Sequence, residues 1–133
     1  MKKTVLMEKY PVFTLEIGKT ETPYRSVGAI IDYFKAKVEA DPIATYIGLF
    51  DHYAHTKSLE NGEIAPEIKD AKNILFCFGQ KLPDPKMLSV RPRSIGVAET
   101  EEAFVVTFLE APMQPMNEKM EAWAKSLAAK ETL

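Results

Sequence analysis

The chain has 133 residues, of which 46% are hydrophobic and 27% are charged, and its formal net charge is -2. These values exclude an intrinsically disordered chain and predict one globular domain over residues 1–133. The small negative charge argues against nucleic acid as a partner, because nucleic-acid binding needs clustered lysine and arginine side chains that neutralise several phosphates.

The first predicted elements are a strand and a long helix. Residues 12–18, VFTLEIG, alternate between two sets of side chains, which is typical of a strand. Residues 23–40 then carry apolar side chains at helical spacing. Thr22 is the expected N-cap of this helix, and Asp41-Pro42 is the expected stop, because a residue before proline disfavours the helical conformation.

The middle of the chain predicts strands with irregular segments between them. Residues 43–55, IATYIGLFDHYAH, are rich in β-branched and aromatic residues, which favours a strand and leaves a helix as the alternative. Residues 73–79, NILFCFG, form a short apolar run of the length of a buried strand. The proline-punctuated segment that follows is expected to be irregular, with a short helical turn over residues 86–90.

The last third of the chain predicts two strands and a second long helix. Residues 94–98 and 103–109 read as strands that are joined by a charged turn. In residues 113–133, Met116, Met120 and Trp123 fall on one helical face, and late lysines such as Lys130 complement the helix dipole.

The order strand, helix, four strands, helix, with short helical inserts, predicts a two-layer α+β fold. We expect a central, mainly antiparallel sheet with the two long helices on one face. The other face also carries aliphatic and aromatic side chains, and an exposed apolar patch of this kind is typical of an interface or a ligand groove. The patch therefore predicts a homodimer, with a ligand pocket as the alternative.

Five short motifs recur in the order and approximate spacing of a known family. They are FDH at 50–52, FCFG at 76–79, DPKML at 84–88, RPRSIGV at 91–97 and FLEAP at 108–112. With these motifs the chain resembles the bacterial domain-of-unknown-function family numbered three hundred and two, or a distant relative of it. The resemblance implies an α+β fold with a central sheet and a tendency to dimerise, and it implies no reaction.

Both histidines of the chain lie in the segment DHYAH at 51–55. On a strand, His52 and His55 point to opposite faces, so the pattern predicts no dedicated metal site. The same alternation places His52 on one face with Tyr46 and Phe50, and it turns Asp51 away from His52.

Two arginines flank a proline in the later part of the chain. Arg91 and Arg93 lie on either side of Pro92 in an extended segment, so they share a side and could hold a carboxylate or phosphate in forked geometry. A solvated basic loop is the alternative. The sequence thus predicts a site for a small anionic or aromatic ligand that contains Tyr46, Phe50, His52, Arg91 and Arg93.

We expect a cytoplasmic protein with no membrane partner. The start of the chain lacks a secretory apolar region, no apolar run approaches the ~18 residues of a membrane span, and the single Cys77 has no intrachain disulfide partner. No catalytic residue or cofactor can be named from the sequence, and the roles of His55 and Cys77 stay open.

The leading hypothesis is a non-catalytic dimer that binds a small anionic or aromatic ligand. One alternative is a small enzyme in which His52 acts as general acid or base and Arg91 or Arg93 holds an anionic substrate. A further alternative is haem or metal binding through His52 or His55.

Overall fold

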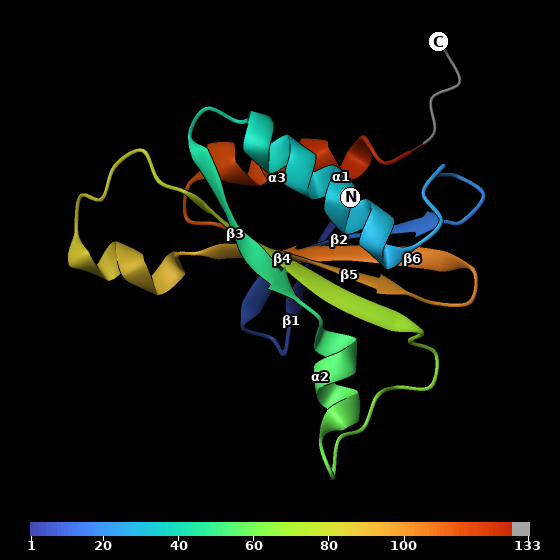
Figure 1. Cartoon of the computed structure of the whole chain (residues 1–133). Helices are drawn as coiled ribbons and strands as arrows, with labels where there is room; N and C mark the ends of the chain where they lie inside the picture. Colours follow the sequence, from blue (N-terminus) through green and yellow to red (C-terminus); the bar gives the residue numbers. More distant parts are fainter. Residues whose placement is uncertain (129–133) are drawn as a thin grey trace.

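The computed structural model describes residues 1–128, and the strands in this part form one antiparallel sheet with the order β1-β2-β6-β5-β4-β3. The strands are β1 (Lys2–Leu6), β2 (Tyr10–Gly18), β3 (Ala44–Phe50), β4 (Asp70–Phe78), β5 (Arg93–Glu99) and β6 (Ala103–Leu109). The helices are α1 (Val27–Ala40), α2 (His52–Ser58), α3 (Gln114–Lys125) and the 3-10 helix η1 (Pro85–Val90). Because α1 and α3 lie on the same side of the sheet (Figure 1), the predicted α+β fold is confirmed.

Strand β1 is an element that the sequence pattern does not predict. It forms a hairpin with β2, and in the turn Met7 and Glu8 have φ angles of 54° and 62°. Positive φ at both central positions is the geometry of the type I′ turn that joins tightly paired strands. Every residue of β1 is exposed, so no alternation of buried and exposed positions marks it as a strand.

Helix α1 begins at Val27, later than the sequence predicts. Ser26 is its N-cap, and the Ser26 side chain accepts a hydrogen bond from the backbone N–H of Ala29 at 3.0 Å. The prediction of Thr22 as the N-cap is wrong, because the buried Thr22 hydroxyl donates to the backbone oxygen of Leu127 at 2.7 Å. This hydrogen bond joins the segment before α1 to the segment after α3.

The predicted strand over residues 43–55 is wrong beyond Phe50. The Asp51 carboxylate accepts a hydrogen bond from the backbone N–H of Ala54 at 3.0 Å, which caps α2 and makes the following residues helical. The pairing of β3 with β4 also shifts between Tyr46 and Gly48, as in a β-bulge. Both features change the face assignments that a regular strand would give.

The core lies between the sheet and the helices α1 and α3. Phe34 on α1, Phe76 on β4, Phe104 on β6 and Met120 on α3 are all fully buried. Each such side chain contributes about 1.5–3 kcal/mol through burial, as an upper estimate for an extended unfolded chain. The ring of Trp123 lies 5.8 Å from that of Phe76, which joins α3 to the middle of the sheet.

Helix α3 is shorter than the predicted span of residues 113–133. It ends at Lys125, and Met120 and Trp123 are buried on its inner face as predicted. The predicted continuation with Lys130 lies outside the described residues.

The sheet face opposite α1 and α3 is less apolar than the sequence predicts. A row of paired residues crosses its centre, and this row consists of Thr14, Thr107, Gly96, Asn73 and Phe50. The hydroxyl oxygens of Thr14 and Thr107 are 3.2 Å apart, within hydrogen-bond distance. Aliphatic side chains such as Leu75 and Val105 lie on this face as expected, on either side of the partly polar row.

Candidate anion-binding cavity

A cavity of about 240 Å³ lies between the loop of residues 79–92, the start of β3 and the connection from β6 to α3. The loop is the yellow and gold segment that extends from the sheet in Figure 1. Most of the lining is apolar and consists of Ile43, Phe78, Pro83, Met87, Val90, Ala111, Pro112, Met113 and Met116. The polar lining consists of Gln80, Lys81, Arg91 and Arg93, and no acidic residue of the described chain is part of it.

Hydrogen bonds within the loop hold one wall of the cavity. Asp84 caps η1, because its carboxylate accepts from the backbone N–H of Lys86 at 2.7 Å. The Arg91 side chain donates from Nη1 to the backbone oxygen of Lys81 at 2.7 Å and so joins the two ends of the loop. The wall has a defined local structure, which positions Lys81 and Arg91 at the cavity.

Asn117 holds the opposite wall. Its side chain is 1% exposed, accepts from the backbone N–H of Ala111 at 2.7 Å and donates to the backbone oxygen of Ala111 at 3.0 Å. This pair of hydrogen bonds fixes the connection from β6 to α3, where Ala111, Pro112 and Met113 face the cavity.

Arg93 is the most unusual polar residue of the cavity. It is the first residue of β5 and pairs with Phe76, and it is only 8% exposed. Its guanidinium donates from Nη2 to the backbone oxygen of Leu109 and from Nη1 to that of Val90 at 3.5 Å. Its Nε has no hydrogen-bond partner, and no carboxylate within residues 1–128 forms an ion pair with it.

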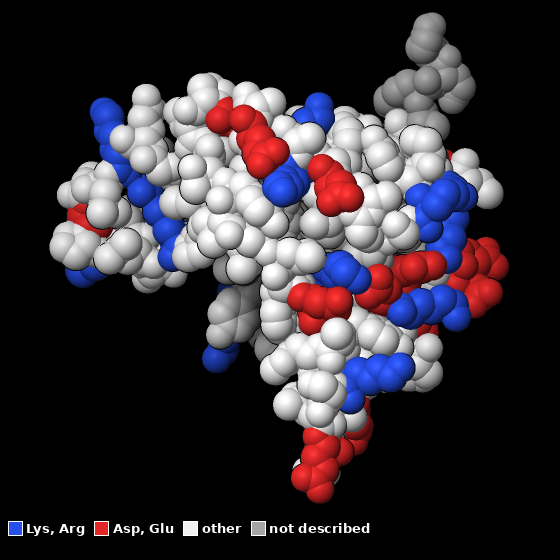
Figure 2. Space-filling view, viewed as in Figure 1, with Lys and Arg blue, Asp and Glu red and all other residues white. Residues whose placement is uncertain are grey.

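The cavity therefore contains a buried positive charge that only backbone carbonyls compensate. Burial lowers the pKa of the Arg93 guanidinium, although an arginine in a protein keeps its proton at neutral pH. Lys81 and Arg91 add positive charge at the same cavity. Figure 2 shows this basic character as blue side chains along the lobe that residues 79–92 form. An anion in this cavity would meet attraction from three cations of the lining, and the described lining contains no acid.

The structure brings Arg91 and Arg93 together but separates them from the other residues of the predicted site. Phe50 pairs with Asn73, whereas Arg93 pairs with Phe76. Asn73 and Phe76 are an odd number of positions apart on β4, so Phe50 and Arg93 belong to opposite faces of the sheet. The structure therefore does not bring Phe50 and Arg93 together in one ligand site, contrary to the prediction.

Tyr46 also lies away from the cavity lining. It shares a row with Phe76 and Arg93, but its half-buried ring packs against the core, and the Lys35 ammonium lies 4.7 Å from the ring centre. The bulge after Tyr46 puts it on a different face from Phe50, contrary to the regular alternation that the sequence suggests.

The two histidines form a separate, exposed cluster. They lie three positions apart on α2, their ring centres are 6.4 Å apart, and the Phe50 ring lies 5.1 Å from His52 and 5.4 Å from His55. The prediction that they point in opposite directions is wrong, because the segment is helical. His52 Nδ1 is 3.0 Å from the Thr56 hydroxyl. In the described part of the chain, no three histidine, cysteine, aspartate or glutamate residues are grouped to hold a metal ion.

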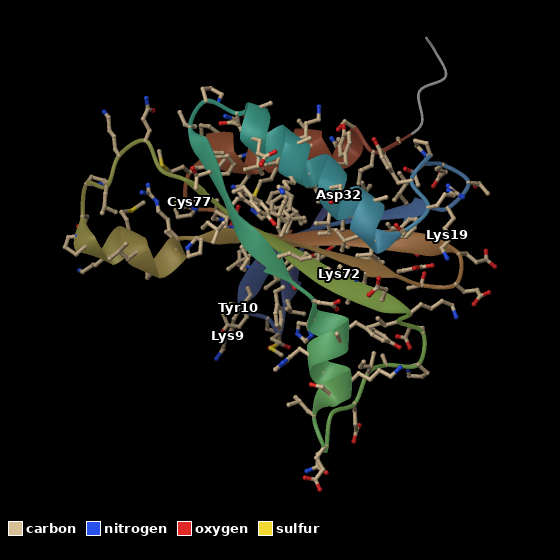
Figure 3. The ribbon with its side chains drawn as sticks, viewed as in Figure 1. Lys9, Tyr10, Lys19, Asp32, Lys72 and Cys77 are labelled. Atoms are coloured by element: carbon tan, nitrogen blue, oxygen red, sulfur yellow. The ribbon has the colours of Figure 1, made fainter. Side chains whose placement is uncertain are left out.

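The two clusters lie toward opposite ends of β4, which Lys72 and Cys77 mark in Figure 3. At the Lys72 end, the ammonium lies 3.0 Å from Asp70 and 3.6 Å from Asp51, so this lysine joins β4 to the capped start of α2. At the Cys77 end, β4 leads into the loop that covers the cavity. The histidine cluster and the cavity with Arg91 and Arg93 are therefore two separate features of the structure.

The cavity also contains residues that the sequence analysis does not assign to a site. Met87, Met113 and Met116 supply flexible apolar side chains, which adapt to ligands of different shape. Their signal in the sequence is weak. Each lies in a proline-punctuated segment near an arginine or an acidic residue, a context that also occurs in ordinary surface loops.

These features define an α+β protein with a cationic, largely apolar cavity at one end of its sheet. The chain belongs to a family of unknown function, DUF6858, whose model matches residues 1–129. The resemblance to the family numbered three hundred and two is therefore wrong, and the motifs on which it rests are short segments of three to seven residues. No curated protein and no solved structure matches the chain. No helix within residues 1–128 has the length and apolar character needed to cross a membrane.

Proposed function

We propose that this protein binds a small organic anion in the cavity beside Arg93 and catalyses no reaction on it. The observation that carries the proposal is the burial of the Arg93 guanidinium against an apolar cavity, without a carboxylate partner within residues 1–128. A buried charge normally has a paired counter-charge, because an unpaired one loses hydration without compensation. A bound anion would supply that counter-charge.

The lining favours a ligand with one anionic group and an apolar body. A planar carboxylate fits the forked donors of a guanidinium, and the methionine, proline and phenylalanine side chains fit an aliphatic or aromatic remainder. The volume of about 240 Å³ lies just below the ~300–1,000 Å³ of common ligand pockets. A compact monocarboxylate is therefore the expected ligand class, and a nucleotide is too large.

The composition of the cavity favours binding over catalysis. General acid-base catalysis needs a group that exchanges protons near neutral pH, most often histidine or a carboxylic acid. Within the described chain the cavity lining has neither, and His52 lies on α2 beyond the other end of β4. This separation argues against the alternative in which His52 acts on a substrate that Arg91 or Arg93 holds. A cytoplasmic location stays part of the proposal, in agreement with the free thiol of Cys77.

Isothermal titration calorimetry tests the proposal with straight-chain monocarboxylates of increasing length and with benzoate. The matched control for each acid is its primary amide, which has nearly the same shape and no charge. The acids are expected to bind at least about tenfold more tightly than the amides, because hydrogen bonds to charged groups contribute about 1.5–3 kcal/mol. Affinity should rise with chain length and then fall once the ligand exceeds the cavity.

Two variants complete this experiment. Arg93→Met should reduce the preference for the acid, with Lys81 and Arg91 still at the cavity. His52→Ala, at the separate cluster, should leave all affinities unchanged. Equal affinities for acids and amides in the wild-type protein, or an undiminished preference for acids in Arg93→Met, would contradict the proposal.

A further inference from the structure

The two edges of the sheet differ in charge. Strands β1 and β3 are the edge strands, so each has one side of its backbone without a strand partner in the described chain. Such an edge can pair with another chain, and proteins commonly block this with charged residues, lysine above all. β1 carries Lys2 and Lys3, whereas residues 42–50, which include all of β3, contain no charged residue.

Strand β3 also exposes large apolar side chains. Ile47 is 50% exposed, Leu49 is 48% exposed and Phe50 is 37% exposed. The uncharged surface along most of the strand is visible in Figure 2. Three exposed apolar side chains within four residues, next to an open strand edge, are typical of an interaction surface.

Gly48 lies at the middle of this edge, directly after the shift in register between β3 and β4. A Cβ atom at Gly48 would meet nothing within 4 Å, and its φ is not positive, so this chain has room for a side chain there. Glycine within a strand often marks a bulge, and the bulge accounts for this glycine.

We infer that β3 pairs with β3 of a second copy of this chain, antiparallel and across a twofold axis near Ile47 and Gly48. A twofold axis brings each residue close to the same residue of the other copy, so a self-pairing strand must avoid charge at its centre. β3 satisfies this condition. The same arrangement at β1 would bring four lysines together.

The pairing would extend the sheet through both copies and cover the exposed side chains of β3. It differs from the expectation that the apolar side chains of the sheet face form the interface, because Thr14, Thr107 and Asn73 are polar residues at the centre of that face. It goes beyond the proposed ligand binding and does not depend on it, since Arg93 lies on β5, β4 separates β5 from β3, and no residue of β3 lines the cavity.

Sedimentation velocity of the full chain, from low to high micromolar concentration, tests the pairing. The wild-type protein should form a dimer. Ile47→Lys should weaken dimerisation at least about tenfold, because two lysines would face each other across the axis. The matched control is Val5→Lys on β1, where Val5 is 58% exposed, and this variant should dimerise like the wild type.

One further measurement identifies the strand. In the wild-type protein, amide hydrogen exchange of residues 44–50 should slow as the concentration rises, whereas exchange in β1 should not change. A wild-type protein that stays monomeric throughout would overturn the inference and leave β3 open to a strand of another protein. A dimer that Ile47→Lys does not weaken, or one without protection in β3, would also overturn it.

Discussion

Replacing Arg93 with methionine should weaken anion binding without destabilising the ligand-free protein. This combination is unusual, because most substitutions of buried residues lower the free energy of unfolding by about 0.5–3 kcal/mol. The expectation follows from the surroundings of the guanidinium, which is 8% exposed and lacks an acidic partner within the described chain.

The magnitude can be estimated from the contacts of Arg93. The substitution removes an unsatisfied buried Nε donor, which costs about 1–3 kcal/mol, and a buried charge whose effective desolvation costs several kcal/mol. It also removes the hydrogen bonds to Leu109 and Val90, each about 1.5–3 kcal/mol with a charged donor, and the second is weak at 3.5 Å. Methionine retains an unbranched apolar side chain that can pack against the cavity. The free energy of unfolding should therefore stay unchanged or rise by up to about 2 kcal/mol.

Urea denaturation with and without a monocarboxylate measures both parts of this prediction. At a ligand concentration of about 100 times the wild-type Kd, the wild-type protein should gain about 2.7 kcal/mol, and Arg93→Met, with at least about tenfold weaker binding, should gain no more than about 1.4 kcal/mol. Met120→Ala in the core provides a reference, with an expected loss of about 2–5 kcal/mol. A loss above about 3 kcal/mol in ligand-free Arg93→Met would refute the reasoning, because it would show that the carbonyl contacts of Arg93 are mainly structural.

Three other substitutions test individual parts of the structure. Asn117→Ala should cost about 1–3 kcal/mol, because it leaves buried backbone groups unpaired, and it should also weaken anion binding; thermal melts and titration measure the two effects. Burial lowers the pKa of Lys72, but the carboxylates of Asp70 and Asp51 outweigh it and raise the pKa overall. Because the pKa of Lys72 is higher in the folded state, the protonated side chain stabilises the fold. This stabilisation is fully present below the unfolded-state pKa of about 10.4 and is lost as the pH rises through the folded-state pKa. Lys72→Met should therefore show a smaller decline in melting temperature at alkaline pH than the wild-type protein. His52→Ala should change the free energy of unfolding by less than about 0.5 kcal/mol, since the side chain is exposed, and a larger loss in denaturant titrations would indicate a structural role.

The α+β fold could be predicted from the sequence because hydrophobic periodicity records which side chains are buried. Strand β6 has Phe104, Val106 and Phe108 on its buried face, and its predicted and observed bounds agree. β1 has no buried face, so periodicity carries no information about it. The pattern of hydrophobic residues therefore predicts a strand reliably only where one face of that strand is buried in the core.

The candidate site could be predicted only in part, because single residues changed its geometry. The cap at Asp51 turns the expected strand into α2, and the bulge after Tyr46 reverses the faces of β3. Neither feature alters the average composition of the segment. The spacing of Arg91 and Arg93 around Pro92 predicts that the two side chains share a side, and both line the cavity. Their role in ligand binding stays a prediction.

The proposed ligand and the inferred dimer rest on places where this chain departs from rules that it follows elsewhere. Many of its other cations have acidic partners, as in the 2.6 Å pair of Lys19 with Glu99, and its other sheet edge is charged. An unpaired buried arginine costs stability, and an uncharged edge strand is open to pairing with another chain. Local inconsistencies of this kind are typical of functional sites. An anion would compensate Arg93, and a strand would pair with β3. Because β4 separates these positions, Ile47→Lys should leave anion affinity unchanged and Arg93→Met should leave dimerisation unchanged. If either variant impaired both properties, the two sites would be coupled, and their treatment as separate features would be wrong.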